Sequence, residues 1–352
     1  MLKYFRPNVL LSDLTTFAVG GPALWLSSPV SAQELKETLE FAKAENLPFY
    51  PVGAGSNILA SDRGFKGIII KYSAAEISFA EDGGNILATA QAGASWDALV
   101  QTTVERNLAG LECLSGIPGN VGAVPIQNVG AYGQEVSNTI ESVEVFDTEK
   151  LETLHLPASA CEFAYRNSRF KRDWRGRYIV ASVTFRLHPH GAPNMRYQDI
   201  ERFFSDKIRM NPQWRPNLSE VRQAVLKVRR SKSMLYDPDN PNHRCAGSFY
   251  LNPIVSRHIA EGLAREYSDM PIFPCEQKDK LKLSAAWLIE HAGFTKGYKF
   301  KRAGLSSDHV LALINTGRAS AQEILELSEQ IIAKVNSKFS ISLVPEPNLL
   351  GF

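Results

Sequence analysis

The chain has 352 residues, which is long enough for two or three packed units, and its 44% apolar and 22% charged residues exclude a disordered protein. Lysine plus arginine (39) almost balances aspartate plus glutamate (37), which excludes a strong overall field for nucleic acid or an anionic membrane. The sequence has no signal-peptide core and no apolar run of membrane-spanning length, so we expect a cytoplasmic protein.

A first lobe with a βαβ-like pattern is predicted for residues 1–72. Residues 31–34 form a Ser-Ala-Gln-Glu capping box, and apolar residues at helical spacing follow it, which predicts a helix to about Asn46. Apolar runs at 49–52 and 67–72 predict two strands around this lobe's central loop.

A second lobe is predicted for residues 73–190. Two strand-like runs flank the Asp-Gly-Gly-Asn turn at 82–85, which predicts a hairpin. Ser95 is expected to cap a helix, and the alternating run at 178–187 predicts a long strand.

A third unit is predicted for residues 191–352. The proline-rich stretch at 188–216 indicates a linker with one short helix at 199–204. A final strand is expected at 341–347, where a glutamate stands between two prolines. The serines expected to cap helices in this unit are Ser219, Ser256, Ser284 and Ser320.

The loop after the first predicted strand of the N-terminal lobe is a candidate anion site. Its sequence is Gly53-Ala54-Gly55-Ser56-Asn57, and glycine-permitted turns can point several backbone N–H groups at one phosphate. It is not the GxGxxG fingerprint of dinucleotide-binding folds, because no third glycine opens a helix. Taken alone, the pattern favours a structural turn.

A glycine-dense segment at 115–133 is the most unusual stretch of the sequence. It carries five glycines and two prolines among apolar residues, so it has few side chains to pack. This composition favours close approach of the backbone to a flat, polar-edged ligand such as an isoalloxazine ring. The alternative is a tight loop at a sheet edge.

Six motifs are spread along the chain and share a resemblance. They are Val52 to Asn57, Ala92 to Trp96, Leu114 to Gly133, Tyr165 to Ser168, Ala246 to Phe249 with Asn252-Pro253, and Pro345 to Pro347. Together they resemble the UDP-N-acetylenolpyruvoylglucosamine reductase family, and the long middle motif is highly specific. The stretch at 188–244 matches only in patches.

The resemblance implies an α+β fold, with a two-lobed FAD-binding part of the vanillyl-alcohol-oxidase (PCMH) type and a C-terminal α/β domain for a UDP-sugar, whose tail returns to the active site. It also implies that NADPH reduces the flavin and leaves before UDP-N-acetylglucosamine enolpyruvate binds and is reduced to UDP-N-acetylmuramate. The residues it implies for FAD binding are Gly53, Ala54, Gly55, Ser56, Asn57, Ser115, Gly116, Ile117, Pro118, Gly119, Gly122, Ala123, Gly130 and Ile179.

Three catalytic residues are implied by the same resemblance. Ser248 matches the proton donor, Arg166 the fork that holds the substrate carboxylate, and Glu346 its hydrogen-bonded counterpart. Without the resemblance, Ser248 would indicate a plain turn, Arg166 a surface residue, and Glu346 a solvated tail.

Further substrate contacts follow from the resemblance. Tyr197 matches a tyrosine on a mobile loop of one family subtype, and Lys232 matches the lysine that grips the diphosphate; a solvated helix C-terminus is the alternative for the basic residues. The remaining implied contacts are Tyr132, Tyr165, Arg229 and Asn252.

The chain also departs from the family pattern. Extra residues, Met234 and Leu235 among them, follow Lys232, and Asn348 stands where the family commonly has a basic residue. If that basic residue normally helps to hold the carboxylate, Arg166 must do more of this work here. Ala54 and Val124 replace a commoner glycine and alanine, changes that a loop acting through its backbone can absorb.

Histidines and cysteines give two further expectations. All seven histidines, the first of them His155, follow the glycine-dense segment, so the histidyl attachment point of related oxidases is missing and we expect non-covalent FAD. His309, beside an apolar run, is expected to be structural. The four cysteines are too widely spaced for a zinc finger or a CxxC motif, which predicts free thiols and no metal site.

Two alternative functions remain open from the sequence. One is a flavin oxidase of the same fold that acts on an alcohol or a lactone, and the other is a UDP-sugar sensor without activity. Ser248 and Lys232 argue against the oxidase, and retention of Arg166, Ser248 and Glu346 together argues against the sensor. We expect a monomer whose partners are small molecules only.

Overall fold

The computed structural model describes residues 3–352, which divide into two compact units. The first comprises the described part of Met1–Val9 with Ala23–Gly55 and Lys66–Tyr236. The second comprises Leu10–Pro22, Ser56–Phe65 and Asp237–Phe352. These limits differ from the three predicted segments, whose boundaries stay a prediction, and residues 1 and 2 of the predicted first lobe lie outside the described residues.

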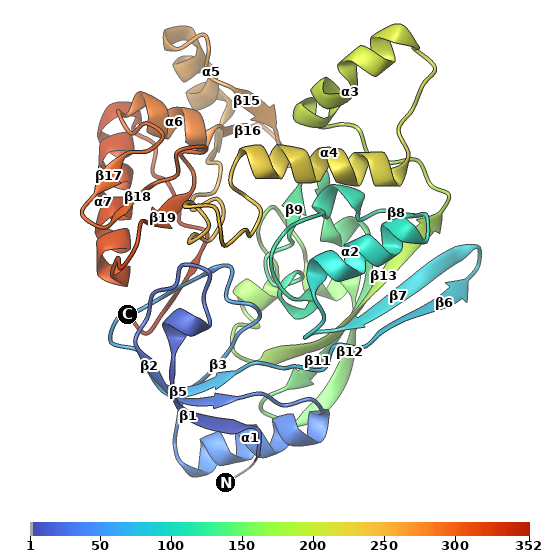
Figure 1. Ribbon diagram of the computed structural model, residues 1–352, viewed down its shortest axis with the longest axis vertical. Coiled ribbons are helices and arrows are strands. Elements are labelled where there is room, and N and C mark those ends of the chain that lie inside the picture. The colour runs from blue at the N-terminus through green and yellow to red at the C-terminus, as the bar shows by residue number, and fades with distance from the viewer. Residues whose placement is uncertain (1–2) are drawn as a thin grey trace. The chain divides into compact units, whose positions relative to one another are not determined.

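The N-terminal lobe of the first unit is a four-stranded sheet with one helix (Figure 1). The helix α1 (Ala32–Ala44) begins where predicted, because the Ser31 side chain accepts the Glu34 N–H. Its buried face packs on the sheet through Leu35 and Leu39. The strand order is β1 (Phe5–Leu10), β2 (Pro22–Ser27), β5 (Phe65–Ile70) and β3 (Phe49–Pro51), with β3 and β5 parallel.

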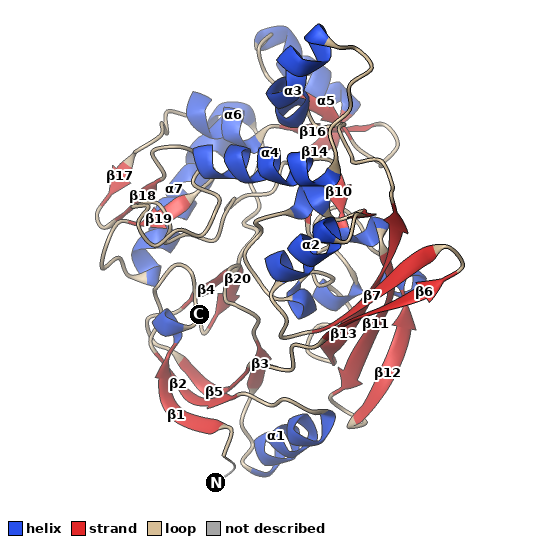
Figure 2. Cartoon of the chain, turned by 45° about the vertical axis from the view of Figure 1, so that its right-hand side comes forward, coloured by secondary structure: helices blue, strands red, loops and turns tan. Residues whose placement is uncertain are grey.

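The second lobe of the same unit is built on a six-stranded antiparallel sheet, seen in Figure 2. The predicted hairpin is confirmed, since Gly83 and Gly84 turn the chain at φ of 57° and 86°. The strand order is β12 (Glu152–Pro157), β11 (Ile140–Asp147), β13 (Tyr178–Pro189), β7 (Asn85–Gln91) and β6 (Ile77–Asp82), with β8 (Leu108–Ala109) paired to β13.

Helices α2 (Trp96–Glu105), α3 (Gln198–Met210) and α4 (Leu218–Ser231) complete the first unit. Ser95 caps α2 as predicted. The short helix predicted at 199–204 is wrong in length, because buried Ile200 and Phe204 anchor a longer amphipathic helix. The prediction that Ser219 caps α4 is also wrong: the N-cap is Asn217, two residues earlier, which forms a reciprocal capping box with Glu220.

The second unit contains three helices that begin at serine caps, as predicted. Ser256, Ser284 and Ser320 each accept a backbone N–H of the first helical turn. The helices are α5 (Arg257–Glu266), α6 (Ala285–His291) and α7 (Ala321–Phe339). Their strands are β14 (Ile254–Ser256), β16 (Lys280–Leu283) and β15 (Ile272–Pro274) in one sheet, and β17 (Lys299–Phe300), β18 (Ala303–Leu305) and β19 (Leu313–Asn315) in another.

The C-terminal strand lies later than predicted. Residues 341–347 form only an isolated antiparallel bridge, between Pro345 and Tyr250, because Pro345 and Pro347 lack the N–H groups that a continuous ladder needs. Instead, β20 (Asn348–Leu350) pairs in parallel with β4 (Ile58–Ala60).

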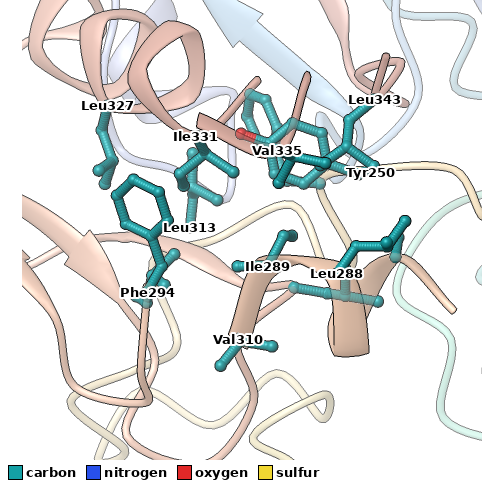
Figure 3. Close-up of a cluster of buried hydrophobic side chains, with 14 of the residues drawn as sticks. Tyr250, Leu288, Ile289, Phe294, Val310, Leu313, Leu327, Ile331, Val335 and Leu343 are labelled. Atoms are coloured by element: carbon teal, nitrogen blue, oxygen red, sulfur yellow. The ribbon is translucent and has the colours of Figure 1, made fainter. Parts of the chain in front are cut away.

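The core of the second unit forms between α6 and α7 (Figure 3). Leu327, Ile331 and Val335 of α7 are fully buried in one cluster with Leu288 and Ile289. Phe17 and Leu59 belong to the same cluster, which explains why 10–22 and 56–65 group with this unit.

Short elements connect these parts. They are β9 (Gly130–Ala131), β10 (Gln134–Glu135) and the 3₁₀ turns η1 (Leu11–Asp13), η2 (Glu112–Leu114), η3 (Val121–Ala123), η4 (Val136–Asn138), η5 (Ala158–Cys161) and η6 (Arg169–Lys171). The four cysteines are free thiols, as predicted. Within residues 3–352, no helix is long and apolar enough to cross a bilayer, and no His, Cys, Asp and Glu side chains group as a metal site.

Candidate active site

The predicted anion loop at 53–57 joins β3 to β4. Gly55 has a φ of 67°, a left-handed conformation that suits glycine. A Cβ placed on Gly53 would lie 3.4 Å from the Ala123 Cβ and 3.5 Å from Asn120 Oδ1. The structure therefore brings the start of this loop against the glycine-dense segment, within the first unit.

Asn120 gives a test of whether a cofactor fits here. Its Nδ2 donates to the Gly93 carbonyl at 2.7 Å, which fixes the amide. Its Oδ1 is buried and has no hydrogen-bond partner among the described residues. An unsatisfied buried acceptor costs about 1–3 kcal/mol, so a ligand that donates an N–H here would remove this cost. The residues thus fit a flat cofactor with a polar edge, as the isoalloxazine ring of FAD has.

Gly122 has no room for a side chain. A Cβ there would lie 2.5 Å from the Ala92 Cβ and 3.1 Å from its Cα, a backbone atom that cannot swing away. We therefore expect Gly122→Ala to destabilise the protein by about 1–3 kcal/mol and to weaken FAD binding. Thermal unfolding with and without added FAD measures both effects.

Gly262 supplies the matched control for this substitution. It lies inside α5, where an added Cβ would meet nothing within 4 Å. Gly262→Ala is expected to stabilise the protein by about 0.5–1 kcal/mol, because alanine is the better helix former. Equal unfolding temperatures for the two variants would show that the Gly122 position is not close-packed.

The peptide groups at Gly116 are held on both sides by charged side chains. The Gly116 N–H donates to Asp97 Oδ1 at 2.6 Å, and its carbonyl accepts Arg229 Nε at 3.1 Å. Asp97 also binds Arg222 through two bonds, of 2.6 and 2.9 Å. Burial raises the pKa of Asp97, but the bonds from Arg222 and Gly116 outweigh it and lower that pKa below its usual range. The glycine-dense segment is therefore fixed to α4.

Met234 and Leu235, which follow Lys232, lie close to the same glycine and its partner Arg229. A Cβ on Gly116 would lie 2.5 Å from Leu235 Cδ2, and Gly116 has a φ of 71°. The Met234 carbonyl accepts Arg229 Nη2 at 2.6 Å. Arg229 is only 9% exposed, and these bonds place its guanidinium against the backbone. Met234 and Leu235 thus lie beside Arg229 and the segment predicted to bind FAD.

Four of the residues predicted to contact substrate lie together in the first unit. The Tyr132 and Tyr197 rings meet edge to face with centroids 5.2 Å apart. Burial raises the pKa of Tyr132, and the nearby positive charges of Arg229 and Lys232 partly oppose this rise. Two aromatic rings and two cations next to each other are suited to a nucleoside diphosphate.

Arg166 lies at a positive φ of 51° and reaches the turn before β9. Its Nη1 donates to the Asn128 carbonyl at 3.5 Å, and its Nη2 donates to the Gly130 carbonyl. The Glu135 carboxylate is 3.9 Å from Nη1. The guanidinium also lies 5.3 Å from the ring centroid of its neighbour Tyr165. The side chain is 19% exposed, so it is oriented by its neighbours and still reachable.

Ser248 lies between two anchored points of the second unit. On one side, the backbone of Cys245 forms an isolated antiparallel β-bridge with Ile314. On the other side, the Phe249 N–H donates to the Leu311 carbonyl at 2.7 Å. Gly247, with a φ of 71° and no neighbour within 4 Å of an added Cβ, leaves the backbone open beside it. Ser248 is therefore half-buried in a short loop, residues 245–249, that is fixed at both ends and is called the arch below.

Glu346 is not a solvated tail residue. Its N–H donates to the Phe249 carbonyl at 2.8 Å, and its carbonyl accepts Asn57 Nδ2 at 3.4 Å. The next residue but one, Asn348, donates its N–H to the Asn57 carbonyl at 2.9 Å. The second unit thus brings together the segments that carry Asn57, Ser248 and Glu346.

Two of the predicted site residues, Asn252 and Ile179, contact other residues of the chain. Asn252 Oδ1 accepts the Ala285 N–H at 2.9 Å, at the start of α6. Ile179 is 4% exposed and its side chain packs in an apolar cluster with Ile70 and Phe146, so its contact with FAD stays a prediction. His309 accepts the Leu311 N–H through Nδ1 at 3.1 Å, which agrees with a structural role.

Several residues that the structure adds to these clusters were not predicted from the sequence. Asp97 and Arg222 hold Gly116, Asn120 carries the unsatisfied acceptor, and Asp199 pairs with Lys232. Of these, Asn120 lay inside the glycine-dense segment and Asp199 at the start of the helix predicted at 199–204, whereas Asp97 and Arg222 lay in no recognised motif.

Comparison with known proteins identifies relatives over the whole chain. The domain described as UDP-N-acetylenolpyruvoylglucosamine reductase, C-terminal domain, matches residues 239–350, and an FAD binding domain matches residues 24–155. UDP-N-acetylenolpyruvoylglucosamine reductase of Thermobifida fusca is 41% identical, with 100% of this chain and 99% of the relative covered. The reductase of the same name from Xylella fastidiosa is 38% identical, with 98% of this chain and 95% of the relative covered. The crystal structure of the Thermus caldophilus reductase superposes with a TM-score of 0.66 at 25% identity, covering 99% of this chain and 100% of that one.

Proposed function

Because this chain belongs to the UDP-N-acetylenolpyruvoylglucosamine reductase family, we propose that Arg166, Ser248 and Glu346 are its catalytic residues. The chain is an FAD-containing, NADPH-dependent oxidoreductase with the α+β fold of the vanillyl-alcohol-oxidase type. It reduces UDP-N-acetylglucosamine enolpyruvate to UDP-N-acetylmuramate, a step in the synthesis of peptidoglycan precursors. The roles of individual residues below are our proposal.

The backbone of the glycine-dense segment and of the loop at 53–57 would hold FAD. When bound, FAD supplies the hydride transfer that links NADPH to the enolpyruvyl group. The buried acceptor of Asn120 and the close-packed Gly122 support this placement, because both favour a ligand held by main-chain and amide groups.

Ser248 would donate the proton to carbon two of the substrate. Addition of a hydride to the terminal vinyl carbon leaves an enolate, which is basic enough to take a proton from a hydroxyl. The arch that carries Ser248 supports this role. Its backbone is fixed by the hydrogen bond of Phe249, so the Ser248 hydroxyl is not needed to hold the loop in place. This arch, hydrogen-bonded to Glu346, is the structural observation that carries the proposed chemistry.

Arg166 would pair the substrate carboxylate as negative charge develops on it. A guanidinium offers two parallel N–H donors to a carboxylate, which a lysine does not. Glu346 would act as the hydrogen-bonded counterpart of Arg166 while carbon two of the substrate is protonated. The half-buried position of Arg166 supports its role, because an electrostatic contact is stronger where water is partly excluded.

The UDP end of the substrate would be held by the cluster of Tyr132, Tyr197, Arg229 and Lys232. We further propose contacts from Tyr165 and Asn252. The chain is proposed to act as a cytoplasmic monomer with small-molecule partners only, and the near balance of its acidic and basic residues supports the absence of a nucleic-acid or membrane partner.

Purified protein is expected to be yellow, and acid precipitation should leave the flavin in the supernatant. NADPH loss, followed at 340 nm under nitrogen, should depend on UDP-N-acetylglucosamine enolpyruvate. Colour that stays in the acid pellet would contradict non-covalent binding. Oxygen uptake with an alcohol or lactone would instead support an oxidase, and substrate binding without NADPH loss would support a sensor.

A further inference from the structure

The ammonium of Lys232 is already held by a carboxylate of the same chain. Lys232 Nζ donates to Asp199 Oδ2 at 2.6 Å. The two side chains are 32% and 27% exposed, so the pair is neither fully solvated nor buried. Asp199 stands two residues after Tyr197, in the first turn of α3, while Lys232 caps the C-terminal end of α4.

This ion pair lies inside the cluster proposed to bind the UDP end. The Tyr132 and Tyr197 rings lie 5.2 Å apart, and the charges of Arg229, Lys232 and Asp199 all act on the pKa of Tyr132, so each of these groups lies near this tyrosine. Arg229 faces the carbonyls of Gly116 and Met234. Asp199 therefore puts a negative charge where a diphosphate, also negative, would have to bind.

The helix that carries Asp199 is anchored independently of the ion pair. Ile200 and Phe204 are buried at 0% and 2% exposure among residues of α4 and η2. Upstream, the Asn194 N–H donates to the buried Glu112 carboxylate at 2.8 Å. Because these contacts hold both sides, rotation of the Asp199 side chain alone can release Lys232.

We propose that Asp199 is the resting counter-ion of Lys232 and competes with the substrate's diphosphate for it. The proposal rests on the proposed role of Lys232 in substrate binding. A diphosphate diester carries two negative charges, so when it takes the ammonium, Asp199 loses its partner and repels the ligand. Asp199 thus lowers the affinity for UDP-sugars and favours their release.

The test measures binding of UDP-N-acetylglucosamine, which has the diphosphate but no enolpyruvyl group, to the FAD-loaded protein by calorimetry. Removing the repelling charge with Asp199→Asn is expected to tighten binding by about 3- to 30-fold, the effect of one unit charge a few ångströms from the ligand. The Michaelis constant for the enolpyruvyl substrate should fall in parallel.

Glu220→Gln is the matched control. Glu220 of α4 forms an ion pair with Lys207 of α3 at 3.0 Å, and the substitution makes the same change of charge. Glutamine also preserves the capping box with Asn217. Binding that tightens only in Asp199→Asn supports the proposal, whereas equal tightening in both variants would reduce it to a general charge effect and overturn it.

Lys232→Gln separates failure of this proposal from failure of the proposed site. If Lys232→Gln weakens binding while Asp199→Asn leaves it unchanged or weaker, the site is correct and Asp199 positions Lys232 instead of competing. If Lys232→Gln binds as tightly as the unchanged protein, the diphosphate lies elsewhere and both ideas fail. Thermal unfolding of each variant checks that the fold is retained.

Discussion

Replacing Ser248 by alanine is expected to lower turnover of the enolpyruvyl substrate by about 10²-fold or more, the usual contribution of a positioned acid. The substitution removes one hydroxyl from an arch whose backbone is fixed at Cys245 and Phe249, so the fold should persist. Reduction of the flavin by NADPH should continue at its normal rate, because that half-reaction needs no proton at carbon two. Stopped-flow absorbance resolves the two half-reactions.

Two further variants show whether the loss is chemical. Ser342→Ala removes an exposed hydroxyl from the segment that leads to Glu346, and it should leave turnover unchanged. Ser248→Cys keeps a proton donor and should recover part of the activity. Turnover within a few-fold of normal in Ser248→Ala, or an equal loss in both half-reactions, would remove Ser248 from the role of proton donor.

The parts of the fold that could be predicted depend on local signals. The capping residues Ser31, Ser95 and Ser320 marked helix starts because a side-chain oxygen satisfies N–H groups only a few residues away. The hairpin at 82–85 was predictable for the same reason, since its glycines set the turn directly. Where two caps competed, as at Asn217 and Ser219, the reciprocal box with Glu220 decided the helix start.

Neighbours far apart in the chain could not be predicted in the same way. The pairing of β4 with β20 joins Ile58 to Asn348, and no local pattern specifies it. It explains why the tail at Glu346 meets Asn57, a contact that the family resemblance only implied through a returning tail. The ion pair of Asp199 with Lys232 is likewise invisible in the sequence, because charged residues in a helix are usually solvated.

Arg166→Ala is expected to lower kcat/KM for the enolpyruvyl substrate by about 10²-fold, comparable to removal of a donor to a developing oxyanion. The guanidinium would bridge the substrate carboxylate while its own position is fixed by the carbonyls of Asn128 and Gly130. Arg166→Lys should lose nearly as much, because a single ammonium cannot reproduce the two parallel donors. Single-turnover oxidation of the reduced flavin by substrate measures the step.

The two functions of Arg166, in the loop and at the substrate, predict different responses to added guanidinium ion. If the charge acts on the substrate, millimolar guanidinium should restore part of the activity of Arg166→Ala, since the small cation can occupy the vacated position. If Arg166 only supports the turn before β9, guanidinium should restore nothing, and FAD affinity should fall together with activity. Arg172→Ala is the control: Arg172 lies further along the same loop, 44% exposed and paired with Glu162, and its loss should affect neither half-reaction. A full loss in Arg166→Ala that guanidinium leaves unchanged would therefore assign the residue to the loop and require another cation for the carboxylate.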